Sequence, residues 1–274
     1  MTKKLKLLLA GFVLCFAAVY ANGKPRIDRK ALVSRNHPHI TAFDSLASFS
    51  VGNGEFAFTA DITGLQTFPE RYSRGVPLGT QSQWGWHSFP DTEKFSHAET
   101  LKNYNFRGRD ESYSVQFNEP GRQQDAANWF RVNPHRLHLG ITGFEIKSLK
   151  EVQSPEQTLN LWEGILYSNF SYKSQSVQVQ TVVDPKQDAV GTYIKGAELP
   201  ALNFRYPYPT GAHADDACNW NNPGQHRTEV LSTLSDKVVL LREIDQTRYY
   251  VTICWEGEAR FAQKEAHYFT LTPL

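Results

Sequence analysis

The chain has 274 residues, 29 basic and 28 acidic side chains, a formal charge of +1 and 13% aromatic residues. So even a balance, with no run of basic residues, argues against nucleic acid or an anionic membrane as a partner. The length is enough for one large β-domain or two small ones.

The first 21 residues have the pattern of a cleavable secretion signal. Lys3, Lys4 and Lys6 precede an apolar stretch over residues 7–18, which is too short to span a bilayer as a stable helix. Small residues then favour cleavage after Ala21. An uncleaved membrane anchor is the less favoured alternative. Residues 22–274 would form the secreted or periplasmic domain, which carries 26 basic and 28 acidic side chains.

Alternating apolar and polar residues indicate strands along almost all of the remaining chain. The first pair, residues 48–51 and 55–60, flanks Gly52-Asn53-Gly54, and this Asn-Gly turn predicts a β-hairpin. Further strands are predicted over residues 113–117, 136–146, 165–172, 177–183, 190–194, 202–206, 238–244, 249–255 and 268–271. So many strands with polar turns predict an all-β fold, a large antiparallel β-sandwich.

Three long loops are expected, over residues 66–95, 119–133 and 207–226. Long loops in a compact domain usually carry function. In the first loop, Trp84 and Trp86 would share one face of an extended segment, with Gln83 and His87 beside them. Flat aromatic rings flanked by amide and imidazole groups suit a pyranose ring. The alternative is a Trp pair that closes the end of the sandwich.

The other two loops offer further candidate substrate contacts. In the second, Asn128 and Trp129 are candidates, with loop packing as the alternative. The third contains His213, Asp215, Asp216, Cys218 and Trp220, so its polar groups could bind substrate hydroxyls or only hold turns. Adjacent carboxylates normally point apart, which argues against a catalytic pair at positions 215 and 216.

The sequence gives no support for a metal or cofactor. His135 and His138 would lie on opposite faces of a strand because of their odd spacing. The mixed carboxylate and thiolate set of the third loop matches no standard ligand spacing. Cys218 and Cys254 are the cysteines that remain after signal cleavage, and they could form a disulfide or stay as free thiols.

Several segments resemble the N-terminal sandwich domain of six-hairpin glycosidases, whose catalytic domain is an (α/α)6 barrel. The similar segments are residues 49–59, with their Gly-Asn-Gly turn, 64–68, 83–87 and 215–220. The resemblance covers roughly residue 28 to the end of the chain. It implies a secreted bacterial protein of carbohydrate metabolism whose sandwich loops line a substrate cleft.

In that family the acid and the base come mainly from the barrel, which this sequence lacks, so no catalytic residue can be assigned. We therefore expect a non-catalytic sandwich of a glycoside-hydrolase-like protein, with carbohydrate and a separately encoded or missing barrel as partners. One alternative is a free-standing carbohydrate-binding module that uses Trp84, Trp86 and Trp129. Another is an interaction domain that docks a protein partner through an apolar face.

Overall fold

The computed structural model describes residues 27–213 and 216–274, so the expected signal segment lies outside the described residues. The chain divides into the units Met1–His37 and Pro38–Leu274. In the first unit, helix α2 (Arg29–Ser34) begins where the Asp28 carboxylate accepts a hydrogen bond from the backbone N–H of Ala31. No helix within the described ranges is long and apolar enough to cross a membrane.

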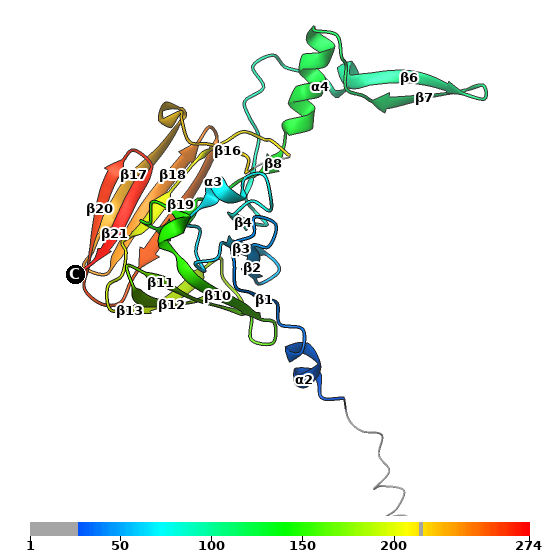
Figure 1. The fold of residues 1–274 in the computed structure, drawn as a ribbon. Coiled ribbons are helices and arrows are strands. Elements are labelled where there is room, and N and C mark those ends of the chain that lie inside the picture. The colour runs from blue at the N-terminus through cyan, green and yellow to red at the C-terminus, as the bar shows by residue number, and fades with distance from the viewer. Residues whose placement is uncertain (1–26, 214–215) are drawn as a thin grey trace, which may run out of the picture. The chain divides into compact units, whose positions relative to one another are not determined.

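The largest sheet of the second unit is antiparallel, with five strands in the order β1-β10-β11-β12-β13. Side chains of β11 and β12 alternate between buried and more exposed positions, because one face of the sheet covers a core. Figure 1 shows the arrangement of the strands. Their bounds are β1 (His39–Ile40), β10 (Gln153–Asn160), β11 (Ile165–Tyr172), β12 (Gln175–Val183) and β13 (Val190–Gly196).

The first core lies between this sheet and the sheet β2-β3-β4, formed by β2 (Phe49–Gly52), β3 (Phe56–Ala60) and β4 (Gly79–Ser82). The predicted hairpin is confirmed, since Gly52 pairs with Ala57. The Asn53 side chain accepts hydrogen bonds from the backbone N–H groups of Glu55 and Phe56. Its amide also donates to the carbonyl of Asp184, so the turn is fixed to the neighbouring sheet.

The second core lies between two further antiparallel sheets, β20-β21-β14-β9 and β17-β18-β19. Leu202 packs against both cores and so connects the two layers of packing. The sheets around these two cores form the all-β sandwich that the sequence predicted. The bounds are β9 (Ile141–Phe144), β14 (Leu202–Arg205), β17 (His226–Thr233), β18 (Lys237–Ile244), β19 (Thr247–Cys254), β20 (Ala259–Glu265) and β21 (Tyr268–Pro273).

A buried segment that contains several polar side chains follows β3. Asp61 accepts hydrogen bonds from the backbone N–H groups of Thr63 and Phe68, and burial raises its pKa to about 6 against the opposing effect of these bonds. Gln66 donates to the carbonyl of Thr59 and accepts from the backbone N–H of Thr142. Its side chain therefore joins the end of β3 to β9, which fixes the base of the loops that follow.

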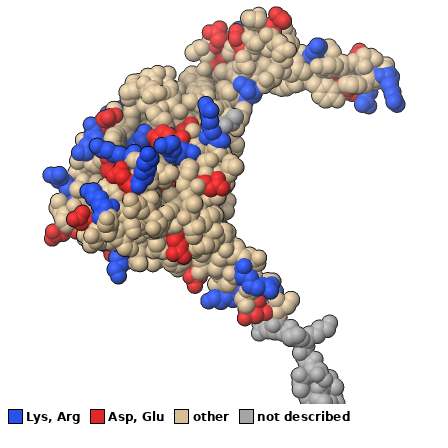
Figure 2. Space-filling view, viewed as in Figure 1, with Lys and Arg blue, Asp and Glu red and all other residues tan. Residues whose placement is uncertain are grey.

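Charged side chains of both signs are interspersed over the face of the sheets that Figure 2 shows. Ion pairs at the surface of the described chain include Arg227 with Glu229 and with the less exposed Glu243. Such pairs contribute little to stability. Their even mixture agrees with the nearly neutral composition and forms no broad electrostatic field of one sign on this face.

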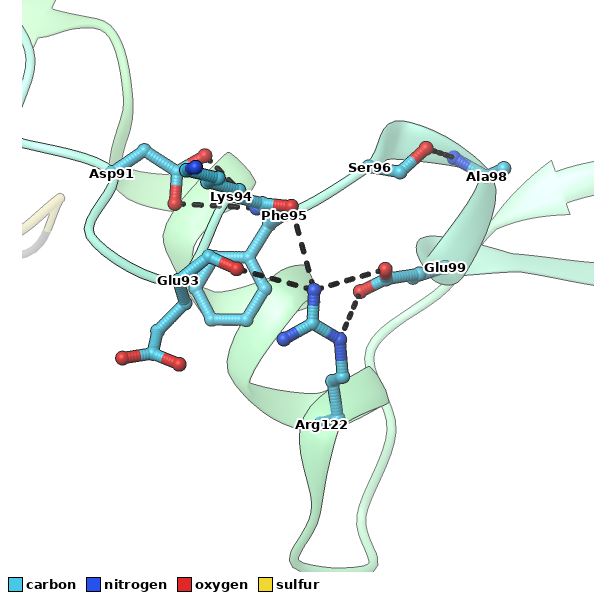
Figure 3. Close-up of polar contacts among 8 residues, drawn as sticks. All are labelled: Asp91, Glu93, Lys94, Phe95, Ser96, Ala98, Glu99 and Arg122. Atoms are coloured by element: carbon cyan, nitrogen blue, oxygen red, sulfur yellow. Dashed lines mark hydrogen bonds and ion pairs between the residues drawn. The ribbon is translucent and has the colours of Figure 1, made fainter.

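The prediction of a loop over residues 119–133 is wrong, because helix α4 (Arg122–Val132) occupies most of it. The helix packs against the 3₁₀ helix η1 (His97–Thr100), which leads into the hairpin of β6 (Leu101–Phe106) and β7 (Arg109–Ser114). Figure 3 shows Arg122 donating to the carbonyls of Glu93 and Lys94 and to the Glu99 carboxylate. One arginine thus connects the helix to the preceding segment.

The other two predicted loops contain short elements, namely α3 (Pro69–Tyr72), β4 and β5 (Trp86–His87) in the first and β15 (Tyr208–Pro209), β16 (Cys218–Asn219) and η3 (Pro223–Gln225) in the third. The predicted strand 136–146 is divided into β8 (His135–Arg136) and β9. The predicted strand 113–117 overlaps only the end of β7. The 3₁₀ helix η2 (Leu149–Glu151), which the sequence did not predict, has a capping box formed by Ser148 and Glu151.

Candidate functional site

A pocket of about 470 Å³, here called the Trp86 pocket, collects residues from all three predicted loop regions or their borders. One side comes from β3 and β4, another from the pair β5-β8 and the residues that follow it, and a third from residues 211–213 and 216–217. Its polar and aromatic lining includes Trp86, His135, Arg136, His138, His213 and Asp216.

The pairing of β5 with β8 builds one wall of the pocket. Trp86 lies opposite Arg136, and His87 lies opposite His135. The Arg136 guanidinium lies 4.1 Å from the centre of the Trp86 ring, and its Nη1 donates to the carbonyls of Ser82 and Gln83. These bonds hold the cation on the ring, while 49% of Trp86 stays exposed. The wall therefore combines an accessible aromatic surface with a fixed guanidinium.

A buried hydrogen-bond chain supports this wall from behind. His135 donates through Nδ1 to the carbonyl of Val132 at 2.7 Å, and its Nε2 lies 3.1 Å from His87 Nδ1. His87 Nε2 lies 3.0 Å from the Asp245 carboxylate, and the Tyr208 hydroxyl donates to the same carboxylate. Burial and the neighbouring His135 lower the pKa of His87, while Asp245 acts in the opposite direction.

This chain changes the interpretation of His87, one of the predicted substrate contacts. The side chain is only 2% exposed, and both of its ring nitrogens contact protein groups. His87 is not part of the pocket lining but lies behind His135. Its position gives it a supporting role for the pocket wall.

His135 and His138 both line the Trp86 pocket, so the expectation that they lie on opposite faces of one strand is wrong. The reason is that β8 ends at Arg136, and the chain after it is no longer a regular strand. His138 accepts from the backbone N–H of Gly140 and donates to the carbonyl of Leu78, and burial lowers its pKa. Both rings are thus held in place by hydrogen bonds to backbone groups.

The third loop contributes the more exposed polar groups. His213 is exposed and donates through Nε2 to the carbonyl of Arg131. Asp216 accepts from the backbone N–H of Cys218. A carboxylate, an imidazole and a guanidinium around an aromatic ring provide both acceptors and donors. No group of three metal-ligating side chains was found in the part of the chain that the structure describes.

The remaining predicted contacts lie elsewhere. Trp84 and Gln83 form a turn instead of an extended segment, and the Trp84 indole donates to Asp188 and contacts the Tyr249 ring. Trp84 therefore does not share a wall with Trp86. Asn128 and Trp129 lie on α4, where Asn128 is exposed and Trp129 packs on Phe95 and Phe130.

Trp220 lines a different pocket, with the Arg205 guanidinium 4.7 Å from its ring centre. Asp215 lies outside the described residues. Cys254 is an exposed free thiol at the end of β19, so within the described ranges it forms no bond with Cys218.

Sequence reasoning missed the contribution of Arg136 and assigned no substrate role to His135 or His138. One signal was present, since the polar residues of the segment 135–138 could have been aligned with residues 84–87. That alignment requires the pairing of two strands of two residues each, about fifty positions apart, which a sequence pattern does not reveal.

Comparisons with known proteins identify no family for this chain. No family model matches it, and no curated protein matches it. Among solved structures, a protein described as a kojibiose phosphorylase from the human microbiome is similar, with a TM-score of 0.45 and 9% sequence identity. The alignment covers 87% of this chain and 30% of that chain, so this chain spans less than a third of its length. A similarity at this level carries no inference about function.

Proposed function

We propose that the Pro38–Leu274 unit is a carbohydrate-binding, non-catalytic sandwich domain, and that the Trp86 pocket is its binding site. The observation that carries the proposal is the half-exposed Trp86 ring, fixed against Arg136 inside a pocket with polar groups from a second loop. A pyranose has an apolar C–H face and a rim of hydroxyls, so it needs this combination of a flat ring and convergent polar groups.

The size and rigidity of the pocket support the proposal. A volume of about 470 Å³ lies within the range of small-ligand sites, roughly 300–1,000 Å³. His135 and His138 are fixed by hydrogen bonds to backbone groups, as is Arg136. A ligand would therefore not have to order these side chains on binding, which reduces the entropic cost of association.

A binding role also matches the chemistry of the lining. Among the described lining residues, Asp216 is the carboxylate, whereas enzymatic hydrolysis of a glycosidic bond normally uses a pair of carboxylates. His135 and His138 have both ring nitrogens engaged by the protein, so neither is ready to act as an acid or a base. Binding requires only that these groups hold their positions.

The wider setting that we propose is a secreted or periplasmic glycoside-hydrolase-like protein in carbohydrate metabolism, whose sandwich loops border a substrate cleft. The resemblance of residues 49–59 and 64–68 to six-hairpin glycosidases supports this setting. In that setting an (α/α)6 barrel, on the same or another chain, would carry the catalytic carboxylates.

A second candidate function is protein docking through the β6-β7 hairpin. Tyr104, Phe106 and Tyr113 contact one another on it, and Phe106 and Tyr113 are about half exposed. A two-stranded hairpin alone is only marginally stable in water, so an aromatic face on one favours a covering partner. Monodisperse behaviour of the purified chain at high concentration, and no partner-dependent protection of these rings, would contradict this function.

The test of the main proposal is glycan binding by the purified chain on an array of neutral and acidic oligosaccharides. The Trp86→Ala variant should lose binding, while Trp162→Ala should retain it. Trp162 is the matched control because it is 46% exposed in the turn between β10 and β11 and lines neither pocket. Equal retention by wild type and Trp86→Ala would contradict the binding site. Robust glycan turnover by this chain alone would contradict the non-catalytic role.

A further inference from the structure

A second pocket, of about 590 Å³, lies over the face of the sheet β20-β21-β14-β9 that is turned away from the second core. Asn203 and Arg205 of β14 and Tyr268 of β21 provide its floor, because Arg205 and Tyr268 are cross-strand neighbours. Glu70, Glu145 and Trp220 stand around this floor. We call it the Trp220 pocket.

The floor contains an unmatched polar atom. Asn203 is only 7% exposed, and its amide Nδ2 donates to the carbonyl of Phe144, yet its Oδ1 accepts no hydrogen bond from the described residues. Its cross-strand neighbour Thr270 is 2% exposed, and the Thr270 hydroxyl also has no hydrogen-bond partner among the described residues. Leaving a buried polar group unpaired is costly, and both atoms have almost no accessible surface, so a ligand would reach them only if the side chains of the floor rearranged.

The walls determine what a ligand must offer. Glu145 accepts from the Tyr268 hydroxyl, and burial together with this bond raises the pKa of Tyr268 to about 12. Glu70 is paired with Arg205 at 3.5 Å, and Glu265 is a third carboxylate of the lining. Carboxylate and amide oxygens are acceptors, so the ligand must supply several donors. Trp220, with Arg205 on its ring, adds apolar surface at the rim.

We propose that the Trp220 pocket binds a polyhydroxylated ring, a saccharide unit, at a site separate from the Trp86 pocket. Hydroxyl groups can donate to Glu145 and Glu265 and can also accept from Arg205, so they match both kinds of charged group in the lining. The volume fits a ligand of this size.

The two pockets share one segment of the chain. Asp216 and Ala217 line the Trp86 pocket, and Asn219 and Trp220 line the Trp220 pocket, on either side of Cys218 in β16. One short segment therefore contributes to both pockets. A saccharide chain that reached both would bind more tightly than either unit alone.

The experiment titrates the purified chain with D-glucose, D-galactose, D-mannose and D-glucosamine and with gluco-oligosaccharides, by isothermal titration calorimetry. It compares wild type, Trp86→Ala, Trp220→Ala, the double variant and Trp162→Ala as control. Asn203→Ala, checked for folding by circular dichroism, tests the floor directly. We expect Trp86→Ala to retain one saccharide site. In the double variant, the added Trp220→Ala should weaken the affinity of that site at least tenfold. Asn203→Ala should also weaken it.

The outcomes separate this inference from the proposed function. If Trp86→Ala abolishes all saccharide binding, the Trp220 pocket is not a saccharide site and the Trp86 pocket stands. If Trp220→Ala abolishes all binding, the Trp86 proposal fails and the Trp220 site stands. Binding of glucosamine without the neutral sugars at the Trp220 pocket would overturn the ligand class. The inference is also overturned if the second site is unchanged in both Trp220→Ala and Asn203→Ala, or if no saccharide binds at all. Either result would mean that only water occupies this floor.

Discussion

The buried Arg242 predicts an unusual pH dependence of stability. Arg242 is fully buried, and its two terminal nitrogens contact backbone carbonyls, the Thr228 hydroxyl and the rings of His226 and His267. Its Nη1 donates to the carbonyl of Arg227, and its Nη2 donates to His226 Nδ1 at 2.7 Å. The rings of His226 and His267 stack at 3.6 Å. Burial, then the charges of Arg242 and His267, lower the pKa of His226 to about 3 from its ordinary value of 6.5.

The direction and the size of the change in stability with pH follow from this lowered pKa. Between pH 6.5 and about 3, the unfolded chain protonates His226 while the folded chain does not, so stability is complete above pH 6.5 and falls as the pH falls. The slope for one such group is at most about 1.4 kcal/mol per pH unit. Because His226 is only partly buried, solvent reduces the effect, and we expect roughly 2 kcal/mol over the whole window.

Urea unfolding at several values between pH 7 and pH 4 measures this effect. His226→Gln retains a side-chain acceptor for Arg242 and removes the titrating ring, so its free energy of unfolding should decline less steeply than that of wild type. His39→Gln, which removes an exposed imidazole, is the control. Parallel curves for wild type and His226→Gln would refute the reasoning, because they would mean that His226 accepts a proton equally well in both states.

Three other substitutions test the packing and the surface. Gly143→Ala should destabilise the domain by roughly 1–3 kcal/mol in urea unfolding, since a Cβ there would lie 2.6 Å from the carbonyl oxygen of Gln66; an unchanged midpoint would contradict that contact. Asn53→Ala should cost roughly 1–3 kcal/mol, because it removes both the turn bonds and the amide bonds to the 184–187 segment; equal stability would show that water replaces them. Phe106→Ser should leave the unfolding midpoint nearly unchanged, as its ring is 51% exposed, and a large loss would mean that the ring is packed.

The strands that the sequence predicts best are those with one buried face and one more exposed face. In β11 and in most of β12 every second side chain is buried, and most of these side chains belong to the first core, so the alternation in the sequence directly reports the structure. Strand β10 was missed because its fully buried residue is Gln157, a polar side chain that donates to the Asp61 carbonyl and to Ser168. A hydrophobic pattern does not identify a strand whose fully buried position is polar.

Helix α4 was missed for a related reason. Its buried residues are Ala126 and Ala127, and it begins after Gly121 without a capping side chain, so neither an apolar stripe nor a cap marks it.

The candidate site was predicted only in part for a different reason. Trp86, His213 and Asp216 do reach one pocket, but the wall also needs Arg136, and only the tertiary pairing of β5 with β8 brings it there.

The central claim is that a saccharide contacts Trp86. The most direct measurement is a nuclear magnetic resonance titration that follows the indole N–H signals of the purified, labelled chain, assigned by single Trp→Ala variants, during addition of a glycan retained on the array. We predict that the Trp86 signal shifts saturably while the Trp162 signal does not, and that Trp86→Ala weakens binding by roughly tenfold or more, about 1.4 kcal/mol. Saturable binding of that glycan with an unmoved Trp86 signal would contradict it.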